Sequence, residues 1–300
     1  MRNLVLETLA NALASRYAVL REIGQGGAAT IFLATDLKHD RLVAIKVLRG
    51  LPGSRVAAER FHREIRLLAR LQHPHILPLH DSGSADGLLY YVTPYIEGES
   101  LHSRLGREKR LPVSEALRIA RQIADALDYA HRRDVIHRDI KPGNILLGDG
   151  NATVADFGIA RAIVNTGEPA LTTSGTALGT PPYMSPEQLL GEPDVDGRSD
   201  IYSLACVLYE MLAGVPPFMG PRGIVENDRK FTDAAPSVAT IADLVPAHVD
   251  EALRRALARL PGHRFATAAL FAAALEPRSE PLANATPAHF PERPDRGLVS

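Results

Sequence analysis

Two short polar stretches that lie close together constrain this chain more than any other feature of its sequence. The first is His137-Arg138-Asp139-Ile140-Lys141-Pro142-Gly143-Asn144, and the second is Asp156-Phe157-Gly158. Apolar runs at residues 145–147 and 153–155 separate them and predict short strands, which places the polar stretches in loops. Carboxylate and amide oxygens are ligands for Mg²⁺, and a lysine neutralises phosphate charge, so this set suits phosphoryl transfer. The alternative interpretation is two Asp-containing turns that follow a helix.

Composition narrows the class of protein. With 300 residues, 45% of them hydrophobic, the chain can form one large bilobed domain or two smaller ones, each with a real core. The formal net charge of −1 gives no support to nucleic acid or an anionic membrane as a partner. The single cysteine, Cys206, excludes a disulfide framework. It suits the reducing cytoplasm, where we expect the protein to be located.

A glycine-rich stretch near the N-terminus lies between β-rich runs. Gly24-Gln25-Gly26-Gly27-Ala28-Ala29 separates predicted strands at residues 17–23 and 30–34, and another strand is predicted at 42–48. Glycine-rich backbone can approach phosphates closely and donate N–H groups to them. A dinucleotide-binding loop would open a helix, and a Walker loop would require Gly-Lys-Ser/Thr, so neither fits. We therefore predict a β-hairpin over a nucleotide.

Helical periodicity dominates much of the remaining chain. It predicts helices at residues 55–71, 113–132, 201–212, 249–260 and 267–275, with a weakly periodic one in 221–233. At the N-terminus, Leu6, Leu9 and Leu13 repeat at helical spacing, so residues 1–15 predict an amphipathic helix rather than a signal peptide. The apolar stretch 201–215 contains Glu210 and is shorter than the roughly 20 residues that a membrane span needs. Residues 277–300 are rich in proline and charge and predict a disordered tail.

Taken in order, these motifs resemble the protein kinases, and in particular the bacterial serine/threonine kinases of eukaryotic type. The resemblance covers about residues 17–275. Its motifs are the glycine-rich stretch, Val43-Ala44-Ile45-Lys46, Glu64, both polar loops, Ser185-Pro186-Glu187, Asp200 and Arg264. It implies an α+β fold in residues 16–276: a small β-rich N-lobe with one key helix (16–93), a hinge (94–98) and a larger, mostly helical C-lobe (99–276). One departure is Ala29, which stands where the family has a third glycine.

The resemblance also implies a role for each site residue. Asp139 orients the attacking hydroxyl, Lys141 stabilises developing charge, and Lys46, fixed by Glu64, positions the ATP phosphates. Asn144 and Asp156 bind Mg²⁺, for which Mn²⁺ can substitute. The expected ATP-binding residues are Ile23, Gly24, Gln25, Gly26, Gly27, Ile31, Ala44, Lys46, Glu64, Thr93, Pro94, Ile96, Asn144, Leu146 and Asp156.

The long segment after Asp156 is expected to regulate the enzyme. It contains Thr172, Thr173, Ser174 and Thr176, which are candidate phosphosites that Arg138 would neutralise once phosphorylated. Its alternative interpretation is a polar loop with incidental hydroxyl groups. Beyond it, the resemblance implies a buried ion pair between Glu187 and Arg264. It also implies that Asp200 accepts hydrogen bonds from the backbone around His137 and Arg138.

The expected reaction is transfer of the ATP γ-phosphoryl group to Ser/Thr hydroxyls of protein substrates, activated by autophosphorylation within a homodimer. A nucleotide-binding pseudokinase that acts as a scaffold is one alternative, but no catalytic position is lost. A small-molecule kinase is the other, but residues 179–183 and 185–187 resemble a protein-substrate site. The chain is expected to be either a soluble kinase or a fragment of a longer, membrane-anchored one.

Overall fold

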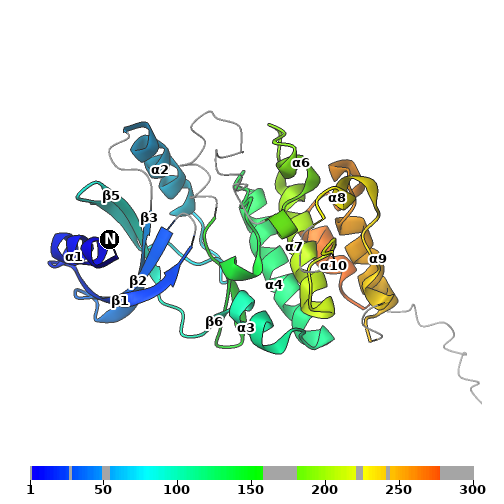
Figure 1. Ribbon diagram of the computed structural model, residues 1–300, viewed down its shortest axis with the longest axis horizontal. Coiled ribbons are helices and arrows are strands. Elements are labelled where there is room, and N and C mark those ends of the chain that lie inside the picture. The colour runs from blue at the N-terminus through cyan, green and yellow to red at the C-terminus, as the bar shows by residue number, and fades with distance from the viewer. Residues whose placement is uncertain are drawn as a thin grey trace, which may run out of the picture.

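In the computed structural model the protein has two lobes, one built on a β-sheet and one mostly helical (Figure 1). The structure describes residues 2–26, 29–48, 55–157, 181–220, 226–240 and 244–277, without the side chains of residues 2–5, 55–57 and 60. The smaller lobe is built on a five-stranded antiparallel sheet with the strand order β1-β2-β3-β5-β4. The strands are β1 (Tyr17–Gln25), β2 (Ala29–Asp36), β3 (Arg41–Leu48), β4 (Asp81–Ala85) and β5 (Leu88–Pro94).

Along β3 and β5, successive side chains point to opposite faces of the sheet, and this alternation decides which of them face the second lobe. On β3, Val43, Ile45 and Val47 are buried in one apolar cluster, while Ala44 and Lys46 lie on the opposite face. The antiparallel register pairs Lys46 with Tyr91 and Ala44 with Thr93. Since directly opposite residues share a face, these four side chains lie on the same side of the sheet.

Helices cover both faces of this sheet (Figure 1). Helix α1 (Arg2–Leu13) packs against β1 and β4, and its Leu9 and Leu13 are buried with the β3 cluster. Helix α2 (Arg55–Leu68) contributes Phe61 and Ile65 to a separate cluster on the other face, together with Leu89 and Tyr91. It ends three residues earlier than the sequence predicts. The chain turns there, with the Leu71 N–H donating to the Leu68 carbonyl, shortly before Pro74.

The larger lobe is mostly helical. Its central pair is α4 (Val113–His131) and α7 (Gly197–Ala213). Ile119, Ile123 and Leu127 lie one turn apart along α4 and are fully buried. The shorter helices are α3 (Leu101–Glu108), α6 (Pro186–Leu189), α8 (Arg229–Thr232), α9 (Ala247–Ala256) and α10 (Ala268–Ala274). A small sheet of β6 (Glu99–Ser100), β7 (Ile145–Gly148) and β8 (Asn151–Val154) completes it, with 3-10 turns η1 (Pro142–Asn144), η2 (Pro181–Tyr183), η4 (Val238–Thr240) and η5 (Pro261–His263).

The predicted fold class, an α+β bilobed kinase fold, is confirmed. Strand β4 and helix α3 were not predicted. The β4 sequence, Asp-Ser-Gly-Ser-Ala, has no β-branched or aromatic residue and forms a strand through its pairing with β5. Helix α3 is short, but the Ser100 side chain accepts the Ser103 N–H at its start. Of the helix predicted within 221–233, the structure has α8 alone, and residues 221–225 lie outside the described part.

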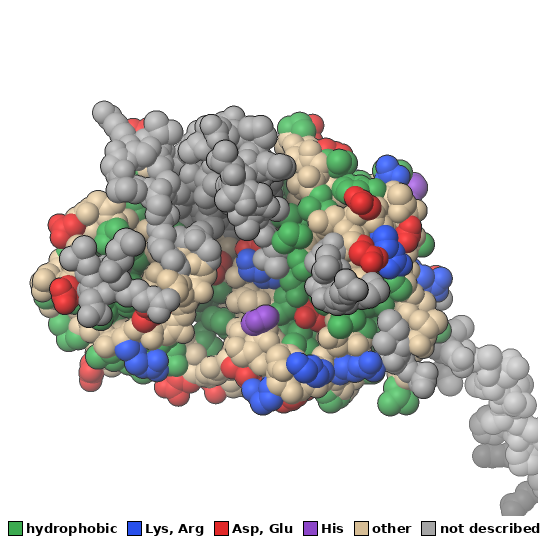
Figure 2. Space-filling model, in the orientation of Figure 1, with side chains coloured by type: hydrophobic (Ala, Val, Ile, Leu, Met, Phe, Trp, Pro, Cys, Tyr) green, Lys and Arg blue, Asp and Glu red, His purple; other side chains and the backbone are tan. Residues whose placement is uncertain are grey.

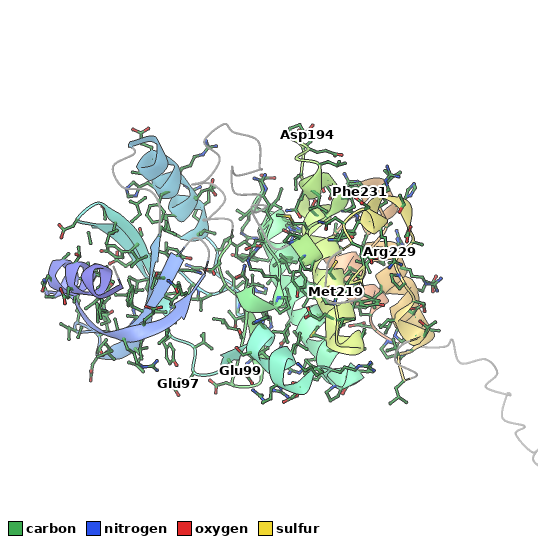
Figure 3. The ribbon with its side chains drawn as sticks, viewed as in Figure 1. Glu97, Glu99, Asp194, Met219, Arg229 and Phe231 are labelled. Carbon is green, nitrogen blue, oxygen red and sulfur yellow. The ribbon has the colours of Figure 1, made fainter. Side chains whose placement is uncertain are left out.

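The chain passes between the lobes through residues 95–98, near Glu97 and Glu99 (Figure 3). Acidic and basic side chains are interspersed on the face shown in Figure 2. In the described part of the chain, no helix combines the length and the apolar character that a membrane crossing requires.

Candidate active site

The first polar stretch forms a loop between α4 and β7, and its functional side chains meet at Asp139. Lys141 Nζ lies 2.7 Å from Asp139 Oδ2, and Asn144 Nδ2 donates to the same oxygen at 3.0 Å and to the Asp139 carbonyl at 2.8 Å. Both contacts converge on Oδ2, so they fix the orientation of the carboxylate. The Asp139 side chain is still 37% exposed, which leaves it accessible to a substrate hydroxyl.

Asp200 fixes the backbone on which this loop is built. Its two carboxylate oxygens accept the N–H groups of His137 at 2.8 Å and Arg138 at 2.7 Å, as the resemblance predicts. Arg138 has a φ of 66°, a left-handed conformation that is unfavourable for a side chain of this size. Burial raises the pKa of Asp200, but a hydrogen bond with His131 and the nearby His137 lower it more. The net pKa is below its ordinary value, and the carboxylate is ionised at neutral pH.

His137 joins the two polar stretches. Its buried ring accepts the Asp139 N–H at Nδ1, 3.2 Å away, so Nε2 carries the proton that it donates to the Ala155 carbonyl at 3.0 Å. The Ala155 N–H in turn donates to the Asn144 carbonyl at 2.9 Å. These bonds place Asp156, which directly follows Ala155, beside Asn144.

Asp156 receives two side chains from the N-lobe sheet. Lys46 forms an ion pair with Oδ2, and the Tyr91 hydroxyl donates to Oδ1 at 2.6 Å. Burial raises the pKa of Asp156, but the charge and hydrogen bond of Lys46 and the hydrogen bond of Tyr91 outweigh it, so the net pKa is lowered. In this structure the partner of Lys46 is thus Asp156, and no ion pair with the half-buried Glu64 occurs within the described residues. Lys46 shares a face of the sheet with Tyr91, on which both α2 and Asp156 lie, and its ammonium group is neutralised there by the Asp156 carboxylate in place of Glu64.

The other predicted nucleotide-binding residues lie on strands of both lobes and on the linker between them. They lie on β1 and just after it (Ile23, Gly24, Gln25, Gly26), on β2 and β3 (Ile31, Ala44), at the end of β5 (Thr93, Pro94), in the linker (Ile96) and on β7 (Leu146). Gly24 pairs with Ile31, and Ala44 with Thr93, so strand register brings these residues together. Gly27 lies outside the described residues.

Comparison with known proteins agrees with this geometry. The family model described as protein kinase domain matches residues 17–268. The chain belongs to the protein kinase family. The family predicted from the motifs is therefore confirmed. Use of ATP and a divalent metal is general to that family.

The chain is similar to several bacterial kinases. The chain is 40% identical over 264 residues to serine/threonine-protein kinase PknB of Mycolicibacterium smegmatis, covering 86% of this chain and 42% of that protein. It is 39% identical over 258 residues to serine/threonine-protein kinase PrkC of Bacillus subtilis, covering 85% and 39%. The predicted enzyme class agrees with these names. The chain spans about two fifths of the length of these relatives.

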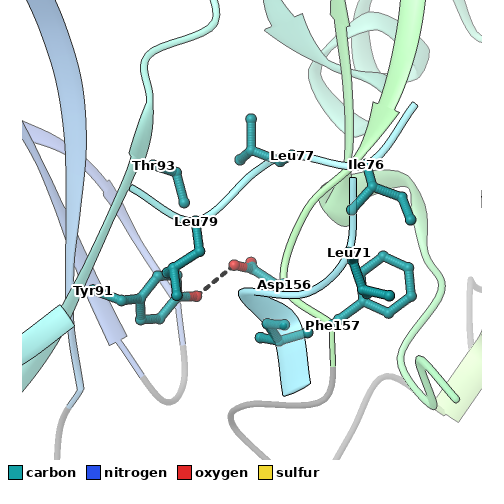
Figure 4. Close-up of a pocket in the computed structure, with 9 residues that line it drawn as sticks. Leu71, Ile76, Leu77, Leu79, Tyr91, Thr93, Asp156 and Phe157 are labelled. Carbon is teal, nitrogen blue, oxygen red and sulfur yellow. Dashed lines mark hydrogen bonds between the residues drawn. The ribbon is translucent and has the colours of Figure 1, made fainter. Parts of the chain in front are cut away.

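Behind Thr93, the kinase site continues into a small, mostly apolar cavity (Figure 4). Leu68, Leu71, Ile76, Leu77, Leu79, Tyr91, Thr93, Asp156 and Phe157 line it. Thr93, one of the predicted nucleotide-binding residues, is a small side chain on the wall of this cavity. Tyr91 and Asp156 are its polar members besides Thr93.

The donor set of the site fits a magnesium ion. Asn144 uses its Nδ2 group to hold Asp139, which leaves its amide oxygen for a cation, and Asp156 supplies a carboxylate. Within the described residues no cluster of three or more His, Cys, Asp and Glu side chains forms a self-contained metal site. Mg²⁺ usually binds to one or two protein carboxylates together with substrate phosphates and water, so two protein ligands are sufficient.

A buried lysine that sequence reasoning missed anchors the segment before Ser185-Pro186-Glu187. Lys230, on α8 between Arg229 and Phe231 (Figure 3), is 2% exposed. Its Nζ donates to the carbonyls of Pro181, Pro182 and Met184 at 2.6, 3.0 and 2.9 Å. Nothing in the local pattern distinguishes Lys230 from a surface lysine, because residues 221–233 are polar and weakly periodic.

Two further contacts hold the same segment against α7. Tyr183 Oη donates to Glu210 at 2.6 Å, and Ser203 Oγ donates to the Tyr183 carbonyl at 2.8 Å. The candidate phosphosites Thr172, Thr173, Ser174 and Thr176 lie outside the described residues, as does Gly158.

Proposed function

We propose that this chain is a serine/threonine protein kinase that transfers the γ-phosphoryl group of ATP to hydroxyl groups of proteins. The observation that carries the proposal is the arrangement around Asp139. Lys141 and Asn144 both contact Oδ2 of this partly exposed carboxylate, and His137 links its loop to Asp156. Few chemistries other than phosphoryl transfer need an accessible carboxylate, a lysine and two metal-binding oxygens in one place.

Each of the site residues has its own role in the reaction. Asp139 accepts a hydrogen bond from the attacking hydroxyl and aligns it with the γ-phosphorus. Lys141, which lies beside Asp139, neutralises charge that develops on the transferred group. Lys46 exchanges its contact with Asp156 for the ATP phosphates, and Glu64 then fixes its position. Most of the rate enhancement is expected from positioning and electrostatics.

Asn144 and Asp156 would hold Mg²⁺, or Mn²⁺ in its place. When bound, the ion neutralises the phosphate oxygens of ATP. The adenine ring would lie against the linker, where Pro94 offers a carbonyl and Ile96 both backbone groups, and Ala44 and Leu146 would contact it.

Regulation by autophosphorylation is part of the proposal. A phosphate on Thr172, Thr173, Ser174 or Thr176 would pair with Arg138, whose backbone is already fixed by Asp200. Autophosphorylation would proceed by phosphoryl transfer from one copy of the chain to the other in a homodimer. We place the catalytic domain at residues 16–276 and the protein in the cytoplasm, which its single cysteine, Cys206, favours.

A phosphate-mapping experiment tests this function. The purified chain is incubated with Mg²⁺ and ATP, alone and with a general protein substrate, and phosphorylated residues are located by mass spectrometry. Wild type should modify hydroxyl groups within residues 158–180, and Asp139→Asn should be slower by about 10²- to 10⁴-fold while it still binds ATP. If wild type binds ATP but transfers nothing, the chain is a scaffold. Transfer to small metabolites alone would indicate a small-molecule kinase.

A further inference from the structure

Tyr91 contacts the predicted metal ligand Asp156 but belongs to none of the motifs that identified the site. It lies directly opposite Lys46 in the register of β3 and β5, so both side chains extend from one face of the sheet toward the second lobe. Lys46 engages Oδ2 of Asp156, and the Tyr91 hydroxyl donates to Oδ1 at 2.6 Å. Figure 4 shows the Tyr91 hydroxyl aimed at this carboxylate at the edge of the cavity.

The surroundings make the Tyr91 contact important for Asp156. The cavity beside the carboxylate is lined mainly by apolar side chains, among them Leu71, Leu77 and Phe157. A carboxylate oxygen that faces such surroundings without a donor is strongly disfavoured. Tyr91 supplies that donor from a fixed position, because its ring is 4% exposed and packed with Phe61 and Ile65 of α2.

The backbone conformation of Asp156 also requires stabilising contacts from its surroundings. Asp156 has a φ of 66°, in the left-handed region that residues other than glycine seldom adopt. Such a conformation persists where surrounding contacts over-determine it. The neighbouring Ala155 provides two of them through Asn144 and His137, and Tyr91 provides the one on the Asp156 side chain itself.

We propose that Tyr91 is a positioning residue for Asp156. The Tyr91 hydroxyl fixes Oδ1 of Asp156, so that the rest of the carboxylate faces the metal. This inference rests on the proposed function. A carboxylate has about four lone-pair positions, so one hydrogen bond to Oδ1 leaves room for a cation. When Lys46 turns to the phosphates, Tyr91 keeps its contact, because it is fixed by strand register and packing rather than by charge. Outer hydrogen bonds of this kind typically change metal affinity by about 10- to 100-fold.

The test compares two variants that each remove one hydroxyl from β5. Tyr91→Phe deletes the donor to Asp156 and keeps the ring. Tyr90→Phe is the matched control, since Tyr90 is the adjacent residue, is also buried, and packs on the opposite face of the sheet with Leu9 and Leu13 of α1. The dissociation constant of ADP is measured by calorimetry with and without Mg²⁺, which requires no catalytic turnover. Metal-free binding also reports whether each variant is folded.

In Tyr91→Phe we expect the gain in ADP affinity on adding Mg²⁺ to fall by about 10- to 100-fold, with metal-free binding unchanged. Tyr90→Phe should match wild type. An unchanged Mg²⁺ effect in Tyr91→Phe would overturn the inference, since Tyr91 would then only fill the core. A larger Mg²⁺ effect would also overturn it, because Tyr91 would be restraining Asp156 from the metal. Wild type that binds no ADP under either condition would instead overturn the proposed function, and this inference with it.

Discussion

Glu187 and Arg264 form a buried, bidentate ion pair that joins two parts of the chain 77 residues apart. The two guanidinium nitrogens lie 2.7 and 2.8 Å from the two carboxylate oxygens, and the side chains are 0% and 5% exposed for Arg264 and Glu187. Arg264 also donates to the carbonyls of Ala258 and Arg259 at 2.8 and 2.9 Å. The pair therefore ties the start of α6 to the loop before α10.

Removing one member of this pair should destabilise the protein strongly. Arg264→Met leaves the Glu187 carboxylate buried without its counter-charge, so the free energy of unfolding should fall by about 3–5 kcal/mol. Urea unfolding measures the change. The control is Arg107→Met, which removes an equally bidentate but exposed pair with Glu99 and should have a much smaller effect. Equal losses in the two variants would contradict the assignment.

The Asp200 carboxylate should make stability depend on pH in the acid range. Its pKa is below the ordinary value of 3.8 in the folded protein, because contacts with His131 and His137 outweigh burial. The unfolded chain therefore binds this proton more readily, and the stabilisation is present above pH 3.8 and lost as pH falls through the folded-state pKa. Urea unfolding of wild type and Asp200→Asn should show a difference at neutral pH that shrinks below about pH 4. A difference that grows on acidification would contradict the prediction.

Lys230 should affect the use of protein substrates more than the use of ATP. Lys230→Met leaves the carbonyls of Pro181, Pro182 and Met184 without this donor, which costs about 1–3 kcal/mol for each group that stays unpaired. Since this segment precedes the Ser185-Pro186-Glu187 motif, KM for a protein substrate should rise several-fold while KM for ATP stays nearly constant. Steady-state kinetics checks this, with the exposed Lys38→Met as control. A parallel change in both constants would indicate a general loss of folding.

The linker glycine should tolerate no side chain. A Cβ on Gly98 would overlap the carbonyl oxygen of Leu147, so Gly98→Ala must displace the backbone between β6 and β7. We expect a loss of about 1–3 kcal/mol in the free energy of unfolding. Gly106→Ala is the matched control, because a Cβ there meets no atom within 4 Å and the position is an exposed one in α3. It should stabilise the protein by about 0.5–1 kcal/mol. Thermal unfolding of both variants measures these opposite signs.

Several features of the fold and the site could be predicted because residue type and order carry the information. Strands β1, β2 and β3 contain β-branched and apolar residues, α4 has clear apolar periodicity, and α7 is an apolar run. The Glu187–Arg264 pair and the hydrogen bonds that Asp200 accepts from the backbone were expected from the resemblance and are confirmed. Strand β4 was missed, because its residues have no intrinsic preference for a strand and depend on their neighbour for it.

By itself, then, the sequence determined the family, the chemistry offered by Asp139, Lys141, Asn144 and Asp156, and most of the elements that present them. The tertiary structure decided which of these groups touch. It paired Lys46 with Asp156, brought Tyr91 to the same carboxylate and buried Lys230 under residues 181–184. Such contacts depend on strand register and on how the lobes and helices pack. A single-residue slip in register would move Tyr91 to the opposite face of the sheet, and local sequence preference does not encode that choice.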